Sequence, residues 1–253
     1  MHNILLLGGT SQASALARLL AERGVAATLS YAGRTDRPMA QPIPVRVGGF
    51  GGVAGLVAYL RDHRITHLVD ATHPFAATMS AHAVEAARQS GVAHVALTRP
   101  AWRAEDGDRW MHVPDIIGAV AALAGSPRRV MLALGRMHVD AFAAQPQHEY
   151  LLRFVDAPAK PPLLPHHSLI IDRGPFGVAG DRALMQAHGI DLVVSKNAGG
   201  TGAQAKIIAA RELGLPVLMI DRPALPACTE LHAPEDVMRW LDHAAPSSAD
   251  RGV

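Results

Sequence analysis

The chain has 253 residues, of which 49% are hydrophobic, so it can bury the core of one large domain or two small ones. A formal net charge of +2 gives no general surface for nucleic acid, and no apolar run is long enough to span a membrane. The single cysteine, Cys228, excludes an internal disulfide and fits a reducing cytoplasm, and the first residues are typical of a strand rather than a signal peptide.

The first predicted element is a strand over residues 4–7, an aliphatic run that a parallel sheet would bury on both faces. Two glycines then permit a tight turn, and Thr10 or Ser11 can cap the following helix, which Gly24 ends. Backbone N–H groups at such a helix start favour an anion. The spacing is not the full G-x-G-x-x-G of dinucleotide binders, so an ordinary strand-to-helix turn stays an alternative. The candidate cofactor-binding residues here are Gly8, Gly9, Thr10, Ser11 and Gln12.

The second predicted strand, residues 26–31, ends where a dinucleotide-binding fold reads the ribose of its cofactor. NAD-dependent enzymes usually place a carboxylate there, whereas this chain offers Ser30, Arg34 and Thr35. An arginine and hydroxyls would bind a 2′-phosphate, so the pattern, with Gly33 beside it, predicts NADPH rather than NADH. Asp36 lies just beyond and weakens the prediction, and a solvated loop arginine is the alternative.

A short strand over residues 45–47 is followed by four glycines around one phenylalanine, which let the backbone approach a flat ligand closely. Gly49, Phe50 and Gly51 are therefore candidates for cofactor binding. A helix over residues 53–60 follows, because its apolar residues recur at helical spacing.

The next strand, residues 66–70, leads into a polar turn with Thr72 and His73, both candidates for cofactor binding. Asp70 and His73 are also weak candidates for proton transfer, and a capping or packing role is equally open. After a helix that stops near Gly91, a strand over residues 92–97 follows.

The charged segment 103–113 is interpreted as the irregular crossing between two domains, after which the alternation of strands and helices restarts. Strands are predicted at 129–134, 150–155, 168–172, 191–195 and 216–220, with helices at 114–124, 183–188, 204–213 and 235–243. The fold class is therefore α/β, with two Rossmann-like parallel-sheet domains facing each other across a cleft. We expect an NADPH-binding domain over 1–105, a substrate-side domain over 106–243 and a flexible tail over 244–253.

Cations follow the predicted strands repeatedly, at Arg34, Arg99, Arg136, Arg173, Lys196 and Arg222. Ligands of open parallel sheets bind beyond the carboxyl ends of the strands, so these residues predict a ligand with several negative groups between the domains. Pairing of some of them with Asp172 or Asp221 is the alternative. Nucleic acid fits poorly, because the loops lack aromatic platforms.

Several other enzyme classes find no support in the sequence. No cluster of residues has zinc spacing, and the Tyr-x-x-x-Lys pair, the G-x-S-x-G elbow and the G-x-x-x-x-G-K-[ST] phosphate loop do not occur. One dinucleotide-type turn accounts for one cofactor, so we expect neither a metal nor a flavin in the redox step. The glycine-rich segment 196–202 leaves room for a flavin as the alternative.

Five segments together closely resemble the precorrin-6A reductases and cobalt-precorrin-6A reductases of cobalamin biosynthesis. They are Leu7–Thr10, Gly48–Gly52, Asp70–Ala76, Arg173–Phe176 and Ser195–Gly200, and the resemblance runs from about Asn3 to Trp240. The segments Asp70–Ala76 and Lys196–Gly200 are specific, whereas the opening Gly-Gly-Thr is not. The first of these two specific segments lies in the predicted domain 1–105, and the second lies in the predicted domain 106–243.

The resemblance implies a cytoplasmic oxidoreductase that reduces precorrin-6A, or its cobalt form, with NADPH to precorrin-6B. The partner is then a corrin precursor, a tetrapyrrole, with no nucleic acid and no membrane, and we expect a monomer although the oligomeric state stays open. Lys196 and Asn197 join the cofactor-binding candidates. The substrate-binding candidates are Arg99, Arg136, Arg173, Gly174, Gly199 and Gly200.

Two other functions stay open on the residues alone. One is a non-catalytic two-lobed protein that binds a polycarboxylate, although it would have no use for the features at Gly8 and Arg34. The other is a different NADP-linked oxidoreductase acting on a phosphorylated metabolite. If the chain is a reductase, we expect His73 and Lys196 to face the same cleft.

Overall fold

The protein divides into two compact units, one of residues up to Pro100 together with those from Ala224 onward, and one from Ala101 to Pro223. The structure is a computed structural model that describes residues 2–33, 40–172, 174 and 176–243. None of the helices in these ranges is long and apolar enough to cross a membrane.

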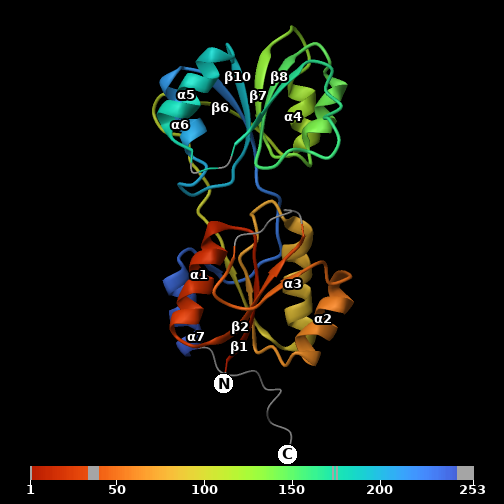
Figure 1. Ribbon diagram of the computed structural model, residues 1–253, viewed down its shortest axis with the longest axis vertical. Coiled ribbons are helices and arrows are strands. Elements are labelled where there is room, and N and C mark those ends of the chain that lie inside the picture. Colours follow the sequence, from red (N-terminus) through yellow and green to blue (C-terminus); the bar gives the residue numbers. More distant parts are fainter. Residues whose placement is uncertain (1, 34–39, 173, 175, 244–253) are drawn as a thin grey trace, which may run out of the picture. The chain divides into compact units, whose positions relative to one another are not determined.

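The first unit contains a parallel sheet in the order β12-β5-β4-β1-β2-β3. Figure 1 labels its strands β1 and β2. Its strands are β1 (Asn3–Leu7), β2 (Ala26–Tyr31), β3 (Val45–Val47), β4 (His67–Asp70), β5 (Ala93–Leu97) and β12 (Glu230–Leu231). Helices α1 (Ser11–Glu22) and α7 (Pro234–His243) cover one face, and α2 (Gly52–Asp62) and α3 (Ala77–Ser90) cover the other.

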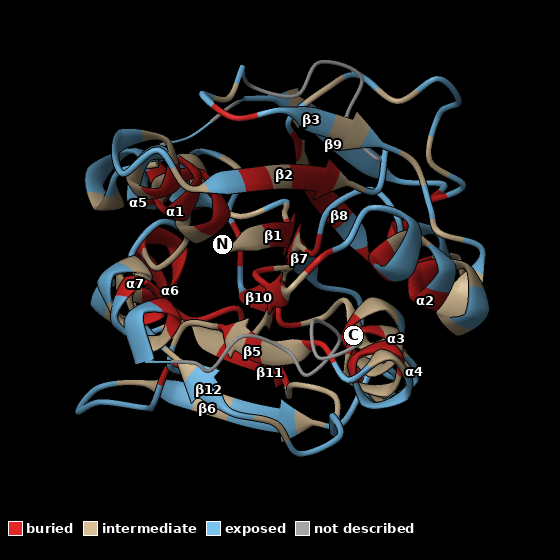
Figure 2. Ribbon diagram, turned by 90° about the horizontal axis from the view of Figure 1, so that it is seen from below, coloured by how far each residue is buried: buried red, intermediate tan, exposed pale blue. Residues whose placement is uncertain are grey.

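Strand β1 is buried on both faces, as its aliphatic sequence predicts. Ile4 and Leu6 pack with α1 and α7, while Leu5 and Leu7 pack with α2 and α3. All four side chains are at most 2% exposed. Each contributes roughly 1.5–3 kcal/mol of hydrophobic free energy relative to an exposed position. The edge strand β3, by contrast, is largely exposed, as Figure 2 shows.

The second unit repeats the design with the order β6-β11-β10-β7-β8-β9, again entirely parallel. Its strands are β6 (Arg109–Val113), β7 (Arg129–Ala133), β8 (Glu149–Phe154), β9 (His167–Ile171), β10 (Leu192–Lys196) and β11 (Pro216–Ile220). Helices α5 (Val178–Ala187) and α6 (Ala205–Glu212) lie on one side of this sheet and α4 (Ile116–Ala122) on the other, with a 3-10 turn η1 (Val139–Ala144) (Figure 1). The predicted class of two α/β domains with parallel sheets is confirmed.

The predicted domain boundary at residue 243 is wrong, because the chain returns to the first unit after Pro223. Strand β12 pairs with β5, placing Glu230 beside Ala96. Val237, Met238 and Leu241 of α7 pack into the core beneath α1. The first unit thus needs a segment from the far end of the sequence to cover one face and one edge of its sheet.

The segment 103–113 is not irregular throughout, since Arg109–Val113 forms the edge strand β6 beside β11. The sequence of β6 shows only a weak alternation of polar and apolar residues. The reason is that β6 is an edge strand with one neighbour and is largely exposed, as Figure 2 shows. Arg211 ties the preceding turn to α6 through hydrogen bonds to both Asp108 and Glu105.

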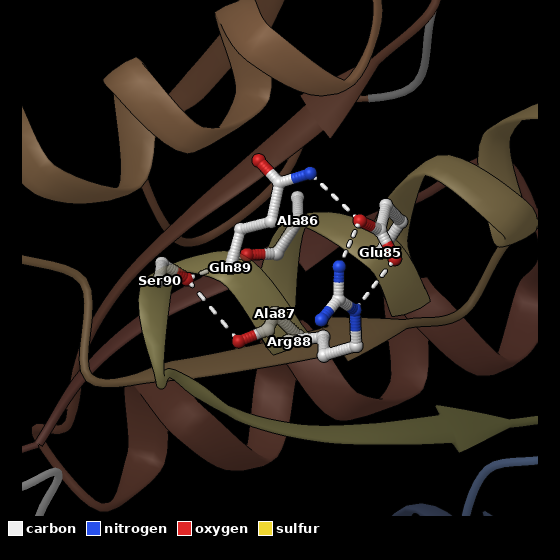
Figure 3. A network of polar contacts seen from close by, with 6 residues as sticks. All are labelled: Glu85, Ala86, Ala87, Arg88, Gln89 and Ser90. Atoms are coloured by element: carbon white, nitrogen blue, oxygen red, sulfur yellow. Dashed lines mark hydrogen bonds and ion pairs between the residues drawn. The ribbon is translucent and has the colours of Figure 1, made fainter.

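Helix α3 ends in an exposed polar network, drawn in Figure 3. Arg88 donates two hydrogen bonds to the Glu85 carboxylate, to which Gln89 also donates, and together they lower the pKa of Glu85 to about 2. Ser90 donates to the carbonyl oxygen of Ala86 in the last turn. Because solvent surrounds the ion pair, it adds little to the stability of the fold.

His67 is the histidine at the start of β4 and is fully buried. Nδ1 hydrogen-bonds with the Thr66 hydroxyl at 2.8 Å, whereas Nε2 has no partner among the described residues. The ring packs edge-on against Trp240, with 5.2 Å between centroids. Burial, with a smaller contribution from His2, lowers the pKa of His67 to about 4.

This pKa makes the stability of the first unit depend on pH. The pKa of His67 is lower in the folded than in the unfolded state. Its contribution to the free energy of unfolding is therefore fully present above pH 6.5 and is lost as the pH falls towards 4. The lowered pKa corresponds to a loss on the order of 3 kcal/mol. We expect His67→Phe to flatten this part of the pH dependence in urea unfolding between pH 7.5 and 4.5. The exposed His166 is the control, and equal flattening by His166→Phe would contradict this origin.

Candidate functional site

The turn after β1 has the geometry of an anion site. The backbone N–H of Gly8 donates to the Ser30 carbonyl oxygen at 2.9 Å, and Gly9 has φ of 122°, a conformation that favours glycine. A side chain at Gly8 would lie 2.5 Å from Leu29 Cδ1, so the turn packs directly on β2. These constraints bring the start of α1 close to the carboxyl ends of β1 and β2.

Thr10, rather than Ser11, caps α1. Its hydroxyl accepts a hydrogen bond from the backbone N–H of Ala13 at 3.2 Å and donates to the Ala71 carbonyl oxygen at 2.8 Å. One side chain therefore fixes the helix start and ties it to the end of β4. The first N–H groups of α1, including those of Ser11 and Gln12, precede the helical hydrogen-bonding pattern and can bind an anion. Gln12 uses its side-chain amide to donate to the His232 carbonyl oxygen.

Strand β1 is the point where the strand order reverses, with β2 and β3 on one side and β4 and β5 on the other. In sheets of this kind a ligand binds outside the carboxyl ends of the strands at that point. The anion site at α1 thus lies between two groups of candidate residues, one after β2 and β3 and one after β4 and β5.

Arg46 organises the β2–β3 side, and the sequence analysis missed it. Its Nη1 donates to Ser30 Oγ at 2.8 Å and to the Gly48 carbonyl oxygen at 3.0 Å, and its Nη2 donates to the Gly49 carbonyl oxygen at 3.1 Å. Its guanidinium lies over the ring of Phe50, 3.9 Å from the centroid. The signal in the sequence was a lone arginine between two valines, directly before the glycines.

The remaining candidates on this side are described in part. Gly33 lies just past β2 with φ of 77°, and Gly51 precedes α2 with φ of 79°. Arg34 and Thr35, the predicted readers of the 2′-phosphate, lie outside the described residues, as does Asp36. Their role therefore stays a prediction.

On the β4 side, the buried Asp70 makes a local turn. Its Oδ1 accepts a hydrogen bond from the backbone N–H of Thr72 at 3.0 Å. His73 Nδ1 accepts from the backbone N–H of Phe75 at 3.2 Å, so the neutral ring carries its proton on Nε2. Asp70 therefore stabilises the turn after β4 and does not cap α3, whose N-cap residue is Ala76. Whether either residue takes part in proton transfer stays a prediction.

Arg99, two residues beyond β5, is half-buried, and no carboxylate of the described residues forms an ion pair with it. Its Nε is inaccessible to solvent and has no hydrogen-bond partner among the described residues. Burial lowers the pKa of this guanidinium. A buried donor without an acceptor costs free energy, which an anionic ligand would recover. This is the property expected of a residue that binds a carboxylate.

In the second unit, Asn197 of the Lys196–Gly200 segment has a structural role. The side chain of Asn197 is buried; its Oδ1 accepts from the Trp102 backbone N–H at 2.8 Å, and its Nδ2 donates to the Trp102 carbonyl oxygen at 3.0 Å. The Trp102 indole donates to the Gly200 carbonyl oxygen at 2.8 Å, and Arg222 donates to the carbonyl oxygen of Asn197. Asn197 therefore holds Trp102 against the end of β10, and Arg222 supports the backbone of Asn197.

The other candidates of the second unit, Lys196 for the cofactor and the rest for the substrate, follow strands of the second sheet. Arg136 is exposed after β7, Lys196 is half-buried at the end of β10, and Gly199 and Gly200 follow with φ of 69° and 70°. Arg173 lies outside the described residues, next to the described Gly174.

Arg153 has its charge neutralised inside the second unit. It forms a buried ion pair with Asp181, and its guanidinium lies 3.7 Å from the centroid of the Phe176 ring. The pair joins β8 to α5 and holds the phenylalanine that follows Gly174. An arginine with such a partner supports the loop rather than binding a ligand.

The structure thus brings the candidates together in two sets, one at the carboxyl edge of each sheet. The prediction that His73 and Lys196 face one cleft between the domains stays a prediction. Among the described residues, no group of three or more His, Cys, Asp or Glu side chains could hold a metal ion.

Comparison with known proteins gives matches along the whole chain. Residues 3–242 match the family described as precorrin-6x reductase CbiJ/CobK. The chain is 57% identical to the precorrin-6A reductase of Rhodobacter capsulatus, with 100% of both chains covered. It is 46% identical to that of Sinorhizobium sp., with 94% of this chain and 93% of the relative covered. The cobalt-precorrin-6A reductase of Priestia megaterium is 30% identical, with 94% and 97% covered.

A solved structure of CobK precorrin-6A reductase has the same architecture. It matches with a TM-score of 0.93 at 57% identity, and the match covers 100% of both chains. The two parallel sheets and their flanking helices are therefore shared with a protein of that name.

The two hydrogen bonds of Asn197 to Trp102 should dominate the stability of the loop after β10. We expect Asn197→Ala to lower the free energy of unfolding by about 2–4 kcal/mol, because two bonds are lost and two buried backbone groups are left without partners. Urea unfolding measures this loss. Asn197→Asp should lose at least as much, because a buried carboxylate oxygen would face the Trp102 carbonyl oxygen that the wild-type amide donates to. The exposed Gln186→Ala is the control. A loss no larger than that of the control would show that the two hydrogen bonds between Asn197 and Trp102 do not stabilise the loop.

Proposed function

Since this chain belongs to the precorrin-6x reductase family, CbiJ/CobK, we propose that it uses NADPH to reduce precorrin-6A itself, rather than its cobalt form. It is an oxidoreductase of cobalamin biosynthesis that reduces precorrin-6A or its cobalt form, and the family implies a nicotinamide cofactor. The choice of NADPH and of the metal-free macrocycle goes further and is proposed here. A cytoplasmic monomer is the accompanying proposal.

The observation that carries the proposal is the turn after β1, in a chain that matches precorrin-6A reductases from end to end. The residues present there fit a dinucleotide. Gly8 and Gly9 allow close approach of a pyrophosphate, Thr10 sets the helix start, and the N–H groups of α1 would hold the negative charge.

The ribose end of the cofactor supports NADPH. Ser30 lies in β2 and accepts a hydrogen bond from Arg46, which lies in β3. Arg34 and Thr35 follow β2 in the sequence. A guanidinium and hydroxyls would bind a 2′-phosphate, which a carboxylate would repel. When bound, the nicotinamide supplies a hydride from C4.

The chain's own residues would place the macrocycle and exclude water. Precorrin-6A carries acetate and propionate groups, which cationic side chains and glycine N–H groups can bind. We assign this role to Arg99 in the first unit and, in the second, to Arg136, Arg173, Gly174, Gly199 and Gly200. Cofactor contacts are further proposed for Gly33, Gly49, Phe50, Gly51, Thr72, His73, Lys196 and Asn197. Asn197 would contribute through its backbone, because its side chain binds Trp102.

The reduced macrocycle needs a proton on a neighbouring carbon. His73, with its proton on Nε2, is the described side chain at the end of β4 that can donate one, and Asp70 can orient the turn that carries it. Solvent is the other source.

The pattern of identities supports the metal-free substrate. Relatives named precorrin-6A reductase are 43–57% identical to this chain, and those named cobalt-precorrin-6A reductase are 27–30% identical. Anaerobic oxidation of NADPH, with precorrin-6A and its cobalt form in parallel assays, tests this choice. We expect the larger kcat/KM with precorrin-6A. A larger kcat/KM with the cobalt form would contradict the choice, and no oxidation with either would contradict the proposed function.

Arg99 provides a second test, because its proposed role in binding conflicts with stability. Arg99→Ala should raise the KM for precorrin-6A by about 10- to 100-fold, the range for a lost charge-assisted hydrogen bond. It should not lower the free energy of unfolding, because the wild-type guanidinium is half-buried and has no counter-ion in the part of the chain that the structure describes. Arg88→Ala, in the exposed pair of Figure 3, is the control. An unchanged KM with a loss of stability would show that Arg99 is structural.

A further inference from the structure

Arg46 is a charged residue whose described partners are all neutral. They are the Ser30 hydroxyl and the carbonyl oxygens of Gly48 and Gly49. No carboxylate of the described residues lies within ion-pair distance of its guanidinium. This contrasts with Arg153 and Arg211, whose guanidinium groups bind carboxylates. Arg46 therefore keeps an uncompensated positive charge at the carboxyl edge of the first sheet.

The guanidinium also keeps unused donors. It carries five N–H groups, and the hydrogen bonds to its neighbours use two on Nη1 and one on Nη2. The N–H of Nε and the second N–H of Nη2 remain. Nitrogens on one guanidinium can bind two oxygens of a phosphate together, which gives both strength and orientation.

Two aromatic rings hold this group in place. The guanidinium lies 3.9 Å from the Phe50 centroid and 5.1 Å from that of Tyr59, and the two rings meet edge to face. Tyr59 in turn stacks on His63, with 4.1 Å between centroids. Because the side chain is fixed before a ligand arrives, binding would cost little conformational entropy.

The place of Arg46 in the sheet identifies the part of a ligand that it can meet. Strand register sets Arg46 beside Ser30, near the end of β2, which is the strand whose end reads the ribose in dinucleotide-binding sheets. Ser30 Oγ accepts from Arg46, so its own proton is available to a second acceptor. A guanidinium and a hydroxyl donor thus lie together at the ribose-reading position.

We propose that Arg46 is the residue that selects NADPH over NADH, by binding the 2′-phosphate with Nε and Nη2 while Ser30 donates a further hydrogen bond. The inference rests on the proposed function, because it requires a nicotinamide dinucleotide at the turn after β1. It assigns the selection of NADPH over NADH to a residue that the structure describes, and Arg34 then contributes less to this selection. The competing role for Arg46 is to clamp the glycine loop Gly48–Gly49 without contacting the cofactor.

Equilibrium binding separates the two roles without the reaction. Calorimetry of NADP⁺ and NAD⁺ should be compared for wild type, Arg46→Ala, Arg46→Lys and Arg34→Ala, with the exposed Arg61→Ala in α2 as the control. We expect Arg46→Ala to weaken NADP⁺ by about 10- to 100-fold more than NAD⁺, because only NADP⁺ has the phosphate. Arg46→Lys should lose less, since it keeps the charge without the paired donors. Arg61→Ala should change neither.

Three results would overturn the assignment. Equal weakening of NADP⁺ and NAD⁺ by both Arg46 variants would show a loop clamp. Discrimination that survives in Arg46→Ala and is lost in Arg34→Ala would give the role to Arg34. A wild-type protein that binds neither dinucleotide would instead overturn the proposed function, and this inference with it. Thermal unfolding of each variant identifies a loss of binding that comes from a loss of fold.

Discussion

Burial of β1 on both faces is the constraint on which the first unit depends. Its four aliphatic side chains pack against helices on the two sides of the sheet, so the strand offers chemistry only at its carboxyl end. There the chain must turn sharply, and Gly8 and Gly9 make this possible. Thr10 then joins the helix start to the end of β4. One packing requirement thus places the anion site and its neighbours at the same edge.

The arginines of the two units divide by what neutralises them. Arg153 and Arg211 have carboxylate partners and support the fold, and Arg222 binds backbone carbonyl oxygens near the end of β10. Arg99 and Arg46 have no carboxylate partner among the described residues, and both lie at the carboxyl edge of the first sheet. Burial without a counter-ion is unfavourable in the absence of ligand, which is the reason to regard them as binding residues.

Local patterns in the sequence predicted the elements that local forces determine. The aliphatic run of β1, its glycine turn and the cap of α1 could all be predicted, as could two parallel sheets. The return of β12 and α7 to the first unit could not, because it depends on which sheet edge and face remain uncovered. Counting cations at strand ends found Arg99 but missed Arg46, which lies inside a strand, and could not show that Asn197 binds Trp102.

In the proposed reaction, hydride passes directly from NADPH to precorrin-6A. The most direct measurement uses NADPH deuterated at the transferred position of C4, with chelator-treated, colourless protein, and locates the label in the product by mass spectrometry and NMR. We expect one deuterium on a carbon of the reduced macrocycle. Deuterium released into solvent, or activity lost on chelation, would show that another carrier takes part and would contradict direct transfer.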